Sequence, residues 1–343
     1  MSGMLEINDL PPPPPGKTGW PWTVASPRVS VEDAPRITIV TPSYNQGDYL
    51  EETIRSVLLQ GYPNLEYIII DGGSTDQSVE IIRKYEKHLA YWISERDRGQ
   101  SEAINKGFDR ATGKIHAFLN SDDVYEPGAL HAVAESMRHG YKWVVGQVRY
   151  LDATGRTWAL PAYPEQSVAE WFLHCPIPQP GSFWHADLHE AVGPFRENLR
   201  YFFDYEFWMR VRFGLNQRRH IIETPLAVYR LHDASKTVSQ NDAFTAEARH
   251  IRREFEGQLT STDRMKVKLA LYRRWACHFG SIAKQRFAAG DRIGGAWMMT
   301  KGVLCWPPLL VDRRMTGALR RVLSGKRAVP ENEPPRVWNY YEC

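Results

Sequence analysis

Apolar and polar residues at positions 36–125 follow two alternating periods, which predict strands separated by helices. Short apolar runs predict strands at 37–40, 65–70, 89–94 and 115–119. Apolar residues at helical spacing predict helices at 50–58, 79–85 and 100–111. Strands that alternate with helices favour an α/β fold with a mainly parallel central sheet, in which ligands gather at the carboxyl ends of the strands.

The alternation loosens after residue 125, where turn residues separate less regular elements. The expected elements are a helix at 127–137, a hairpin of strands at 143–151 and 156–160, strands at 182–186 and 227–231, and a helix at 204–213. We therefore expect one large domain at 36–255, with a first half at 36–125 and a second half at 126–255.

The N-terminal residues 1–35 differ in composition from this domain. The run Pro11–Pro15 excludes a helix or a central strand, because proline lacks the backbone N–H that both need. We expect an extended, proline-rich arm that Trp20 and Trp22 dock onto the domain.

The positive charge is concentrated near the C-terminus. Residues 264–327 contain fifteen Lys and Arg but two acids, whereas the rest of the chain holds 28 bases and 38 acids. We expect a basic helical appendage at 260–328 and a tail at 329–343. The appendage suggests an anionic membrane surface as a partner, and no nucleic acid is expected because no recognition motif accompanies the charge.

Two further features bear on the setting of the protein. The apolar stretch at 294–311 is interrupted by Lys301 and by Pro307–Pro308, which favours an interfacial or core helix over a membrane span. The four cysteines are scattered, and the N-terminus has no signal-peptide pattern. We therefore expect a cytoplasmic protein, or one that is peripheral on the inner face of the membrane.

Asp122 and Asp123 follow the predicted strand at 115–119 directly. Carboxylates at the end of a buried strand are costly unless a positive group is held there, and hard divalent cations prefer oxygen ligands. The pair predicts one half of a metal–diphosphate site. The alternative is a solvated turn that caps a helix.

Four polar motifs at or near strand ends occur in an order that resembles one known family. They are Thr41–Asn45, Asp71–Asp76, Asp97–Ser101 and Asn120–Asp123. Together they resemble the nucleotide-sugar half of a family 2 inverting glycosyltransferase with the GT-A fold, and the resemblance covers residues 36–240. It implies a GT-A nucleotide-sugar-binding fold, with the helical region as a C-terminal appendage.

The resemblance implies that the four motifs hold the nucleotide part of a sugar donor. The implied nucleotide-binding residues are Thr41, Pro42, Tyr44, Asn45, Asp71, Asp97, Gln100, Asn120, Ser121 and Asp122. From the residues alone, Tyr44 offers a ring for stacking on a base, and Asp71 offers a carboxylate for a base N–H or a ribose hydroxyl. The alternative for Asp71 is a cap for the turn at Gly72–Gly73.

A divalent cation, Mn²⁺ or Mg²⁺, is the expected cofactor. Its expected ligands are Asp122, Asp123 and, by resemblance, His232. Asn120 stands where the family's Asp-x-Asp signature has its first acid. An amide oxygen still accepts from a ribose hydroxyl or a metal-bound water, so the negative charge of the site rests on Asp122 and Asp123.

Asp204 is the expected general base, because it lies among aromatic residues that would raise its proton affinity. It also matches the family's acidic motif on the acceptor side. The expected acceptor-binding residues are Gln179, Glu206 and Trp208, and Glu206 is the second choice as base. Asp204 could equally cap the following helix, and that role does not exclude the first.

These expectations describe an inverting glycosyltransferase that moves a sugar from a nucleotide-diphosphate donor, by default a UDP-sugar, to a hydroxyl of a glycan or lipid-linked acceptor. Cell-surface polysaccharide biosynthesis is the expected setting. One alternative is a catalytically idle protein that binds nucleotide sugars or glycans. Another is a sugar nucleotidyltransferase, although Ser43–Gln46 lacks the Gly- and Lys-rich phosphate loop which that class normally needs.

Overall fold

The computed structural model describes residues 4–27, 33–160, 167–232 and 241–305. The chain divides into two compact units. The first contains the described residues up to 160 together with 177–232 and 241–255. The second contains residues 167–176 and 256–305, so a short segment from the middle of the chain joins the C-terminal helices.

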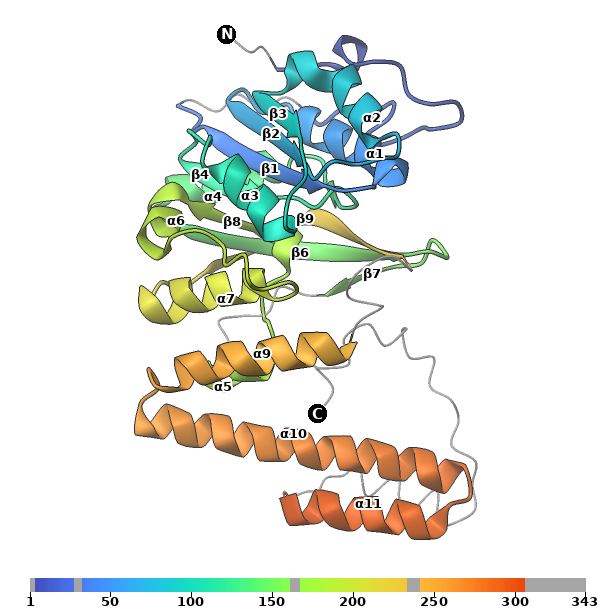
Figure 1. Cartoon of the computed structure of the whole chain (residues 1–343), viewed down its shortest axis with the longest axis vertical. Helices are drawn as coiled ribbons and strands as arrows, with labels where there is room; N and C mark the ends of the chain where they lie inside the picture. The colour runs from blue at the N-terminus through green and yellow to red at the C-terminus, as the bar shows by residue number, and fades with distance from the viewer. Residues whose placement is uncertain (1–3, 28–32, 161–166, 233–240, 306–343) are drawn as a thin grey trace. The chain divides into compact units, whose positions relative to one another are not determined.

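Nine strands of the described chain form one sheet in the first unit, in the order β3-β2-β1-β4-β8-β6-β9-β5, with β7 beside β6 (Figure 1). The strands are β1 (Ile37–Ser43), β2 (Leu65–Asp71), β3 (Tyr91–Ser94), β4 (Ile115–Phe118), β5 (Val124–Tyr125), β6 (Trp143–Asp152), β7 (Thr157–Leu160), β8 (Ser182–His185) and β9 (His220–Leu231). The α-helices of this unit are α1 (Gly47–Leu58), α2 (Ser78–Tyr85), α3 (Gln100–Phe108), α4 (Ala129–Arg138), α6 (Ala186–Val192), α7 (Phe203–Met209) and α9 (Asn241–Glu256, of which the unit includes residues up to Phe255).

The first four strands are parallel, as the alternation of strands and helices predicts. Ser43 is paired with Asp71, so β1 and β2 end side by side and their following loops meet. Helix α3 packs closely on β1, because a Cβ on Gly107 would lie 2.4 Å from Cγ1 of Val40. The small residue at this position lets the helix reach the sheet.

The second half of the sheet is mixed. Strand β8 is antiparallel to both β4 and β6, while β9 runs parallel to β6. The expected strand at 227–231 is much longer in the structure and begins at His220. Exposed Glu223 and Thr224 and the following Pro225 hid this extension, and the pairing with β6 is irregular there.

Within the first unit, the N-terminal arm is held against the α/β domain, as the two tryptophans predict. Trp20 Nε1 donates to the carbonyl oxygen of Tyr125 at 2.8 Å, and Trp22 is buried. Arg55 in α1 is a second anchor, which the sequence pattern did not indicate. Its buried guanidinium donates to the carbonyl oxygens of Pro21 at 3.1 Å and Trp22 at 2.9 Å.

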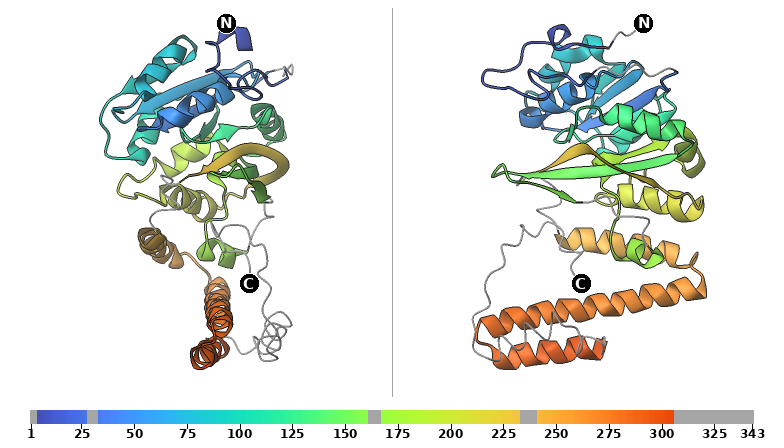
Figure 2. Two further views of the ribbon diagram at one scale, coloured as in Figure 1. Left: turned by 90° about the vertical axis from the view of Figure 1, so that its right-hand side faces the viewer. Right: turned by 180° about the vertical axis from the view of Figure 1, so that it is seen from behind.

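The second unit contains α5 (Val168–Leu173), α10 (Ser261–Ala288) and α11 (Arg292–Cys305). Helices α10 and α11 pack side by side as a hairpin (Figures 1 and 2), with Ala276 and Ala283 of α10 fully buried. The expected helical character is therefore confirmed up to residue 305. Residues 306–328 and the tail at 329–343 lie outside the described residues. Among the helices that the structure describes, none is long and apolar enough to cross a lipid bilayer.

Candidate active site

Asp71, at the end of β2, organises the loop that follows it. Its Oδ2 accepts from the backbone N–H groups of Gly73 at 3.1 Å and Ser74 at 2.8 Å, and from the hydroxyl of Ser94 at 2.7 Å. Its Oδ1 accepts from the hydroxyl of Ser74 at 2.5 Å. This buried carboxylate has the capping role that was the alternative for it, and its contact with a nucleoside remains a prediction.

Asn45 joins the loops that follow β1 and β2. Its backbone N–H donates to Ser74 Oγ and its Oδ1 accepts from the backbone N–H of Thr75, both at 2.8 Å. The residue adopts a φ of +51°, a left-handed conformation that asparagine tolerates better than most residues. The neighbouring side chain of Tyr44 is 60% exposed, so its ring is available for stacking at this edge.

The structure corrects the expected positions of Thr41 and Pro42. Strand β1 continues to Ser43, so both residues lie inside the sheet and are buried. The hydroxyl of Thr41 lies 3.1 Å from that of Tyr67, in the interior. Their side chains are therefore not presented to a ligand at the strand end, and a nucleotide contact through their backbone groups remains a prediction.

Asp97 lies against the loop after β2. A Cβ on Gly72 would lie 2.6 Å from Asp97 Oδ2, so the glycine provides the space that this carboxylate occupies. Asp97 also accepts from the backbone N–H of Gly99 at 3.0 Å. Burial, reinforced by the nearby carboxylates of Glu102 and Asp71, raises the pKa of Asp97.

Asn120 is the centre of a side-chain network after β4. Its Oδ1 accepts from Gln100 Nε2 at 2.6 Å, and its Nδ2 donates to Asp123 Oδ2 and Gln179 Oε1, both at 3.3 Å. Gln179 in turn donates to the carbonyl oxygen of Phe118 at 2.7 Å. An amide both donates and accepts here, which an ionised aspartate could not do.

The same contacts correct the expectation for Gln179. Its side chain is buried beneath the Asn120–Asp123 turn, where it supports Asn120. It was expected to bind the acceptor instead. No sequence pattern connects these two amides, because they lie 59 positions apart.

Asp123 is buried and anchored on two sides. Its Oδ1 accepts from the backbone N–H of Arg230 at 3.1 Å, and its Oδ2 accepts from Asn120. Burial, followed by the like charge of Asp122, raises its pKa well above the usual range. Thr53 in α1 donates to the carbonyl oxygens of Ser121 and Asp123, at 2.9 and 2.7 Å, which holds the turn against the helix.

Asp122 and His232 meet where β4 and β9 end. Asp122 Oδ2 lies 3.0 Å from His232 Nε2, and both side chains remain partly accessible. The ring of His232 stacks on Tyr49 of α1, with centroids 4.6 Å apart. Arg230, two residues before His232, pairs with Glu52 of the same helix at 2.5 Å.

A carboxylate and an imidazole suit a cation such as Mn²⁺, so this pair fits the expected cofactor. Within the part of the chain that the structure describes, no group of three His, Cys, Asp or Glu side chains is arranged to hold a metal. Asp123 does not complete such a group here, because it is buried and both its oxygens accept protein hydrogen bonds. The expected three-residue ligand set is therefore reduced to Asp122 and His232.

Asp204 lies in the first turn of α7. Its Oδ1 accepts from the backbone N–H of Tyr205 at 2.7 Å, so the direction of the carboxylate follows the backbone of this turn. The capping alternative is corrected, because α7 begins at Phe203 and Phe202 is its N-cap residue, so Asp204 lies inside the helix. Its role as a base remains a prediction.

The structure corrects the expectations for Glu206 and Trp208, which point into the interior from the same helix. Glu206 is fully buried, and its oxygens lie 3.0 Å from the Nε atoms of both Arg196 and Arg210. Trp208 is also fully buried and stacks on Trp143 with centroids 5.0 Å apart. Neither side chain is presented to an acceptor, because every residue of α7 except Asp204 is buried.

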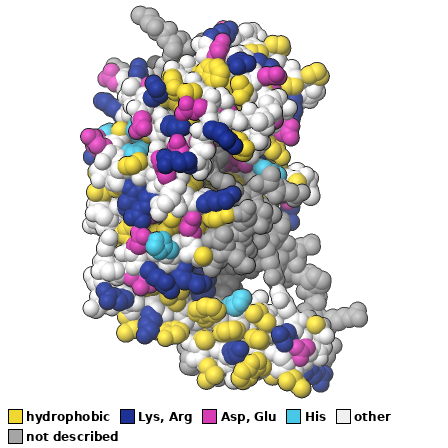
Figure 3. All heavy atoms as spheres, in the orientation of Figure 1, with side chains coloured by type: hydrophobic (Ala, Val, Ile, Leu, Met, Phe, Trp, Pro, Cys, Tyr) yellow, Lys and Arg dark blue, Asp and Glu magenta, His cyan; other side chains and the backbone are white. Residues whose placement is uncertain are grey.

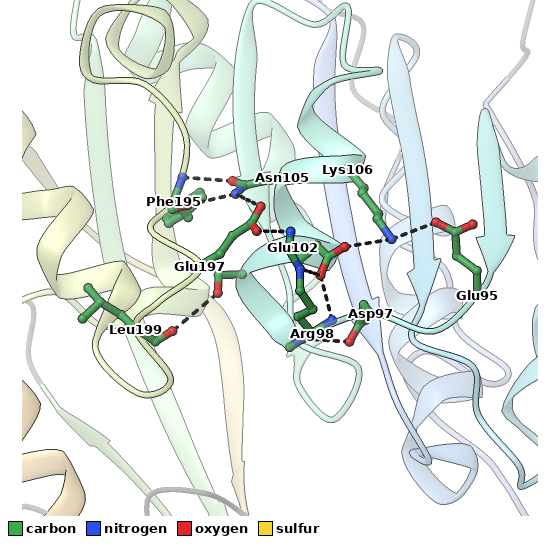
Figure 4. A network of polar contacts seen from close by, with 11 residues as sticks. Glu95, Asp97, Arg98, Glu102, Asn105, Lys106, Phe195, Glu197 and Leu199 are labelled. Carbon is green, nitrogen blue, oxygen red and sulfur yellow. Dashed lines mark hydrogen bonds and ion pairs between the residues drawn. The ribbon is translucent and has the colours of Figure 1, made fainter.

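A further polar network links the two halves of the first unit (Figure 4). Asn105 and Arg98, from α3 and the loop before it, contact residues of the loop that precedes α7. Sequence reasoning did not assign these contacts, because they join residues that are 90 and 99 positions apart in the chain.

Comparison with known proteins agrees with the motifs. The family model "Glycosyl transferase family 2" matches residues 38–204. A putative teichuronic acid biosynthesis glycosyltransferase, TuaG of Bacillus subtilis, is 42% identical over 108 residues, which are 30% of this chain and 42% of TuaG. An uncharacterised glycosyltransferase of Mycobacterium tuberculosis is 30% identical over 183 residues, which are 52% of this chain and 69% of that protein. The chain thus spans less than half the length of TuaG.

Solved structures show the same fold at low identity. S. aureus TarS 1-349 in complex with UDP-GlcNAc has a TM-score of 0.55 and 17% identity, over 84% of this chain and 87% of TarS 1-349. The mannosyltransferase PcManGT of Pyrobaculum calidifontis, in complex with GDP-Man and Mn²⁺, has a TM-score of 0.54 and 15% identity, over 88% and 83%. The fold is therefore of the GT-A type, and the chain belongs to glycosyltransferase family 2.

Proposed function

We propose that the protein is an inverting glycosyltransferase that uses a nucleoside-diphosphate sugar and a divalent cation. The observation that carries this proposal is the contact between Asp122 and His232, beside the loops that end β1 and β2. Chemistry in α/β sheets is typically located at such strand ends. Here one edge combines an exposed aromatic ring, carboxylates and an imidazole.

On the donor side, Tyr44 and the Asn45 loop would hold the base, and Asp97 and Asn120 would contact the nucleoside or the donor sugar. Asp122 and His232 would hold Mn²⁺ or Mg²⁺, which neutralises charge on the diphosphate when it is bound. PcManGT contains Mn²⁺ together with its GDP-sugar, which supports a metal-dependent reaction in this fold.

On the acceptor side, Asp204 would accept the proton of an acceptor hydroxyl. The hydroxyl oxygen then attacks the anomeric carbon as the nucleoside diphosphate leaves with its bonding electrons. A single displacement without an enzyme nucleophile inverts the configuration at that carbon. The carboxylate of Asp204 thus needs one defined position, which the backbone of α7 would supply.

The donor is by default a UDP-sugar, and TarS with UDP-GlcNAc supports that choice, while PcManGT with GDP-Man makes a GDP-sugar the alternative. A glycan or lipid-linked acceptor in cell-surface polysaccharide biosynthesis is the proposed setting. The similarity to TuaG, a putative teichuronic acid biosynthesis enzyme, supports it.

The proposal is tested by release of UDP or GDP from UDP-GlcNAc and GDP-mannose, with and without Mn²⁺, followed by an acceptor screen. Asp204→Asn should abolish turnover and leave UDP or GDP binding unchanged. Binding without turnover in the wild type would instead favour the idle nucleotide-sugar binder. NMR of the product should show the anomeric configuration opposite to that of the donor, and retention would refute the inverting mechanism.

The second unit favours a membrane surface as an additional partner. Its α10–α11 hairpin exposes large apolar side chains among Lys and Arg (Figure 3), namely Met265, Leu269, Tyr272, Trp275, Ile293, Trp297 and Leu304. Exposed tryptophans beside basic residues suit the interface of an anionic bilayer. At Trp297 the two features meet, because Lys301 Nζ lies 5.2 Å from the centre of its ring.

This surface predicts binding to vesicles of phosphatidylglycerol and phosphatidylcholine that weakens at high salt. Trp275→Ser combined with Trp297→Ser should reduce binding, whereas Leu215→Ser, at an exposed site in the first unit, should not. Equal binding to vesicles of phosphatidylcholine alone, or binding to duplex RNA in place of vesicles, would contradict it.

A further inference from the structure

The loop at 195–202 connects the core to the helix that carries Asp204, and its first part is bound to α3. Asn105 Oδ1 accepts from the backbone N–H of Phe195 at 2.9 Å, and its Nδ2 donates to the carbonyl oxygen of Phe195 at 2.8 Å. The same Nδ2 lies 3.2 Å from Glu197 Oε1 (Figure 4). One buried amide therefore holds both backbone groups of Phe195.

The loop is also bound to the donor side of the site. Arg98 Nη2 pairs with Glu197 Oε2 at 2.6 Å, and Arg98 directly follows Asp97 (Figure 4). Arg98 is itself held by Glu102 of α3, through its Nε at 2.8 Å and its backbone N–H at 2.7 Å. The start of the loop is thus connected to the segment that is proposed to contact the nucleotide.

The end of the loop is held by one carboxylate from α9. Glu247 Oε1 accepts from the backbone N–H of Arg200 at 2.6 Å, and its Oε2 accepts from those of Tyr201 and Phe202 at 2.8 Å each. Three successive N–H groups therefore converge on Glu247. Charge-assisted hydrogen bonds of this kind are roughly twice as strong as neutral ones.

Phe202 is the residue immediately before α7, and its side chain makes no cap hydrogen bond. Glu247 comes from a distant helix and binds the N–H groups that precede α7, including that of the N-cap residue Phe202. Asp204 lies two residues further on, and its carboxylate is bonded to the backbone of its own turn. A shift of residues 200–202 would therefore move the carboxylate of Asp204.

We propose that Glu247 is a positioning residue for Asp204, which it sets through the backbone of residues 200–202. This inference rests on the proposed role of Asp204 as the base. Because the other end of the loop is bound beside Asp97, Glu247 also completes a connection from the donor loop to the base. Displacement of a reacting group by about 1 Å can lower a rate on the order of 100-fold.

The test compares Glu247→Gln and Glu247→Asp with the control Glu256→Gln. Glu256 is exposed at the C-terminal end of the same helix, and it takes part in none of the contacts described above that hold the loop at 195–202. A glutamine at 247 presents an N–H₂ group to at least one of the three N–H donors. Hydrogen–deuterium exchange of the 198–209 region is measured for each folded protein, together with UDP and GDP affinity and release of UDP or GDP from UDP-GlcNAc and GDP-mannose with Mn²⁺.

We expect Glu247→Gln to exchange faster at 200–205 and to lower the maximal rate of nucleotide release about 10- to 100-fold, with UDP or GDP affinity unchanged. Glu247→Asp should recover part of both properties, and Glu256→Gln should match the wild type in rate and exchange. Unchanged exchange at 200–205 would overturn the proposal whether or not turnover is detected. A parallel loss of rate and nucleotide affinity in both Gln variants would reduce Glu247 to a general structural role.

The proposed function can fail separately from this inference. If Asp204→Asn keeps full turnover, Asp204 is not the base, and a positioning role of Glu247 for it is lost as well. If Asp204→Asn is inactive and Glu247→Gln turns over at the wild-type rate, the base assignment stands and only the role of Glu247 is wrong.

Discussion

Asp122 Oδ2 lies 3.0 Å from His232 Nε2, although the two residues are 110 positions apart in the chain. The contact exists because β4 and β9 both end at this edge of the sheet. It brings a carboxylate of the Asn120–Asp123 turn next to an imidazole from the second half of the domain. Neither half contains the site alone.

Replacing His232 with alanine should weaken Mn²⁺ binding by at least about tenfold, because His232 is one of two protein ligands in the proposed site. Mn²⁺ titration in the presence of UDP or GDP, monitored by calorimetry, measures the effect. His220→Ala is the matched control, since that histidine stacks on Tyr141 away from the site. Equal Mn²⁺ affinity in the His232 variant and the wild type would exclude His232 as a ligand.

Asn120→Asp should destabilise the protein, even though it restores the acid that the family signature has. The substitution removes the donor to Asp123 and Gln179 and adds a charge beside the buried Asp123. The cost should be about 1–3 kcal/mol in the free energy of unfolding, measured with urea. Asn120→Ala, which removes the donor without adding a charge, should cost less. If Asn120→Asp is as stable as the wild type and binds Mn²⁺ more tightly, the site accommodates a third acid beside Asp122 and Asp123.

Glu206→Gln should lower the free energy of unfolding by about 1–3 kcal/mol, because it removes the buried charge that accepts from Arg196 and Arg210. Nucleotide release per folded molecule should change little at low temperature. Thermal unfolding and active-site-normalised rates separate the two properties. A large loss of rate with full stability would return Glu206 to the acceptor-binding role that the sequence suggested.

Acid should destabilise the protein through His116. Burial lowers the pKa of this histidine to about 4, from an ordinary value near 6.5. The folded state therefore disfavours protonation of His116, whereas the unfolded state takes up the proton near pH 6.5. The stability of the folded protein is thus unaffected by His116 above pH 6.5 and decreases as the pH falls toward 4. The change is about 3 kcal/mol, since each pKa unit corresponds to about 1.4 kcal/mol.

His116→Phe should flatten the dependence of stability on pH between 6.5 and 4, because phenylalanine keeps a ring beside Phe108 without a titrating group. His139→Phe, at an exposed position, should leave the dependence as it is in the wild type. Urea unfolding at a series of pH values measures both. If the free energy of unfolding depends on pH equally in His116→Phe and the wild type, the folded protein accommodates the protonated imidazole.

Much of the first half of the domain followed from local pattern. Strands β1, β2 and β4 and helices α1 to α3 lie where apolar spacing predicts them, because each buries a continuous face that the pattern exposes directly. Strand β9 was underestimated, since exposed polar residues and a proline interrupt its first half. Glu206 and Trp208 were placed in the right helix, but the pattern did not show that α7 is buried on nearly all sides.

The sequence by itself determined the order of the elements, the four polar motifs and the family to which they belong. These properties are local, because they depend on residue types at fixed spacing. The tertiary structure decided which side chains face a ligand and which support the loops. Glu206, Trp208 and Gln179 look suitable for binding in the sequence, yet packing buries all three. Two contacts join residues that are far apart in the sequence, so no local pattern encodes them. They are the contact of His232 with Asp122 and that of Glu247 with the loop before Asp204.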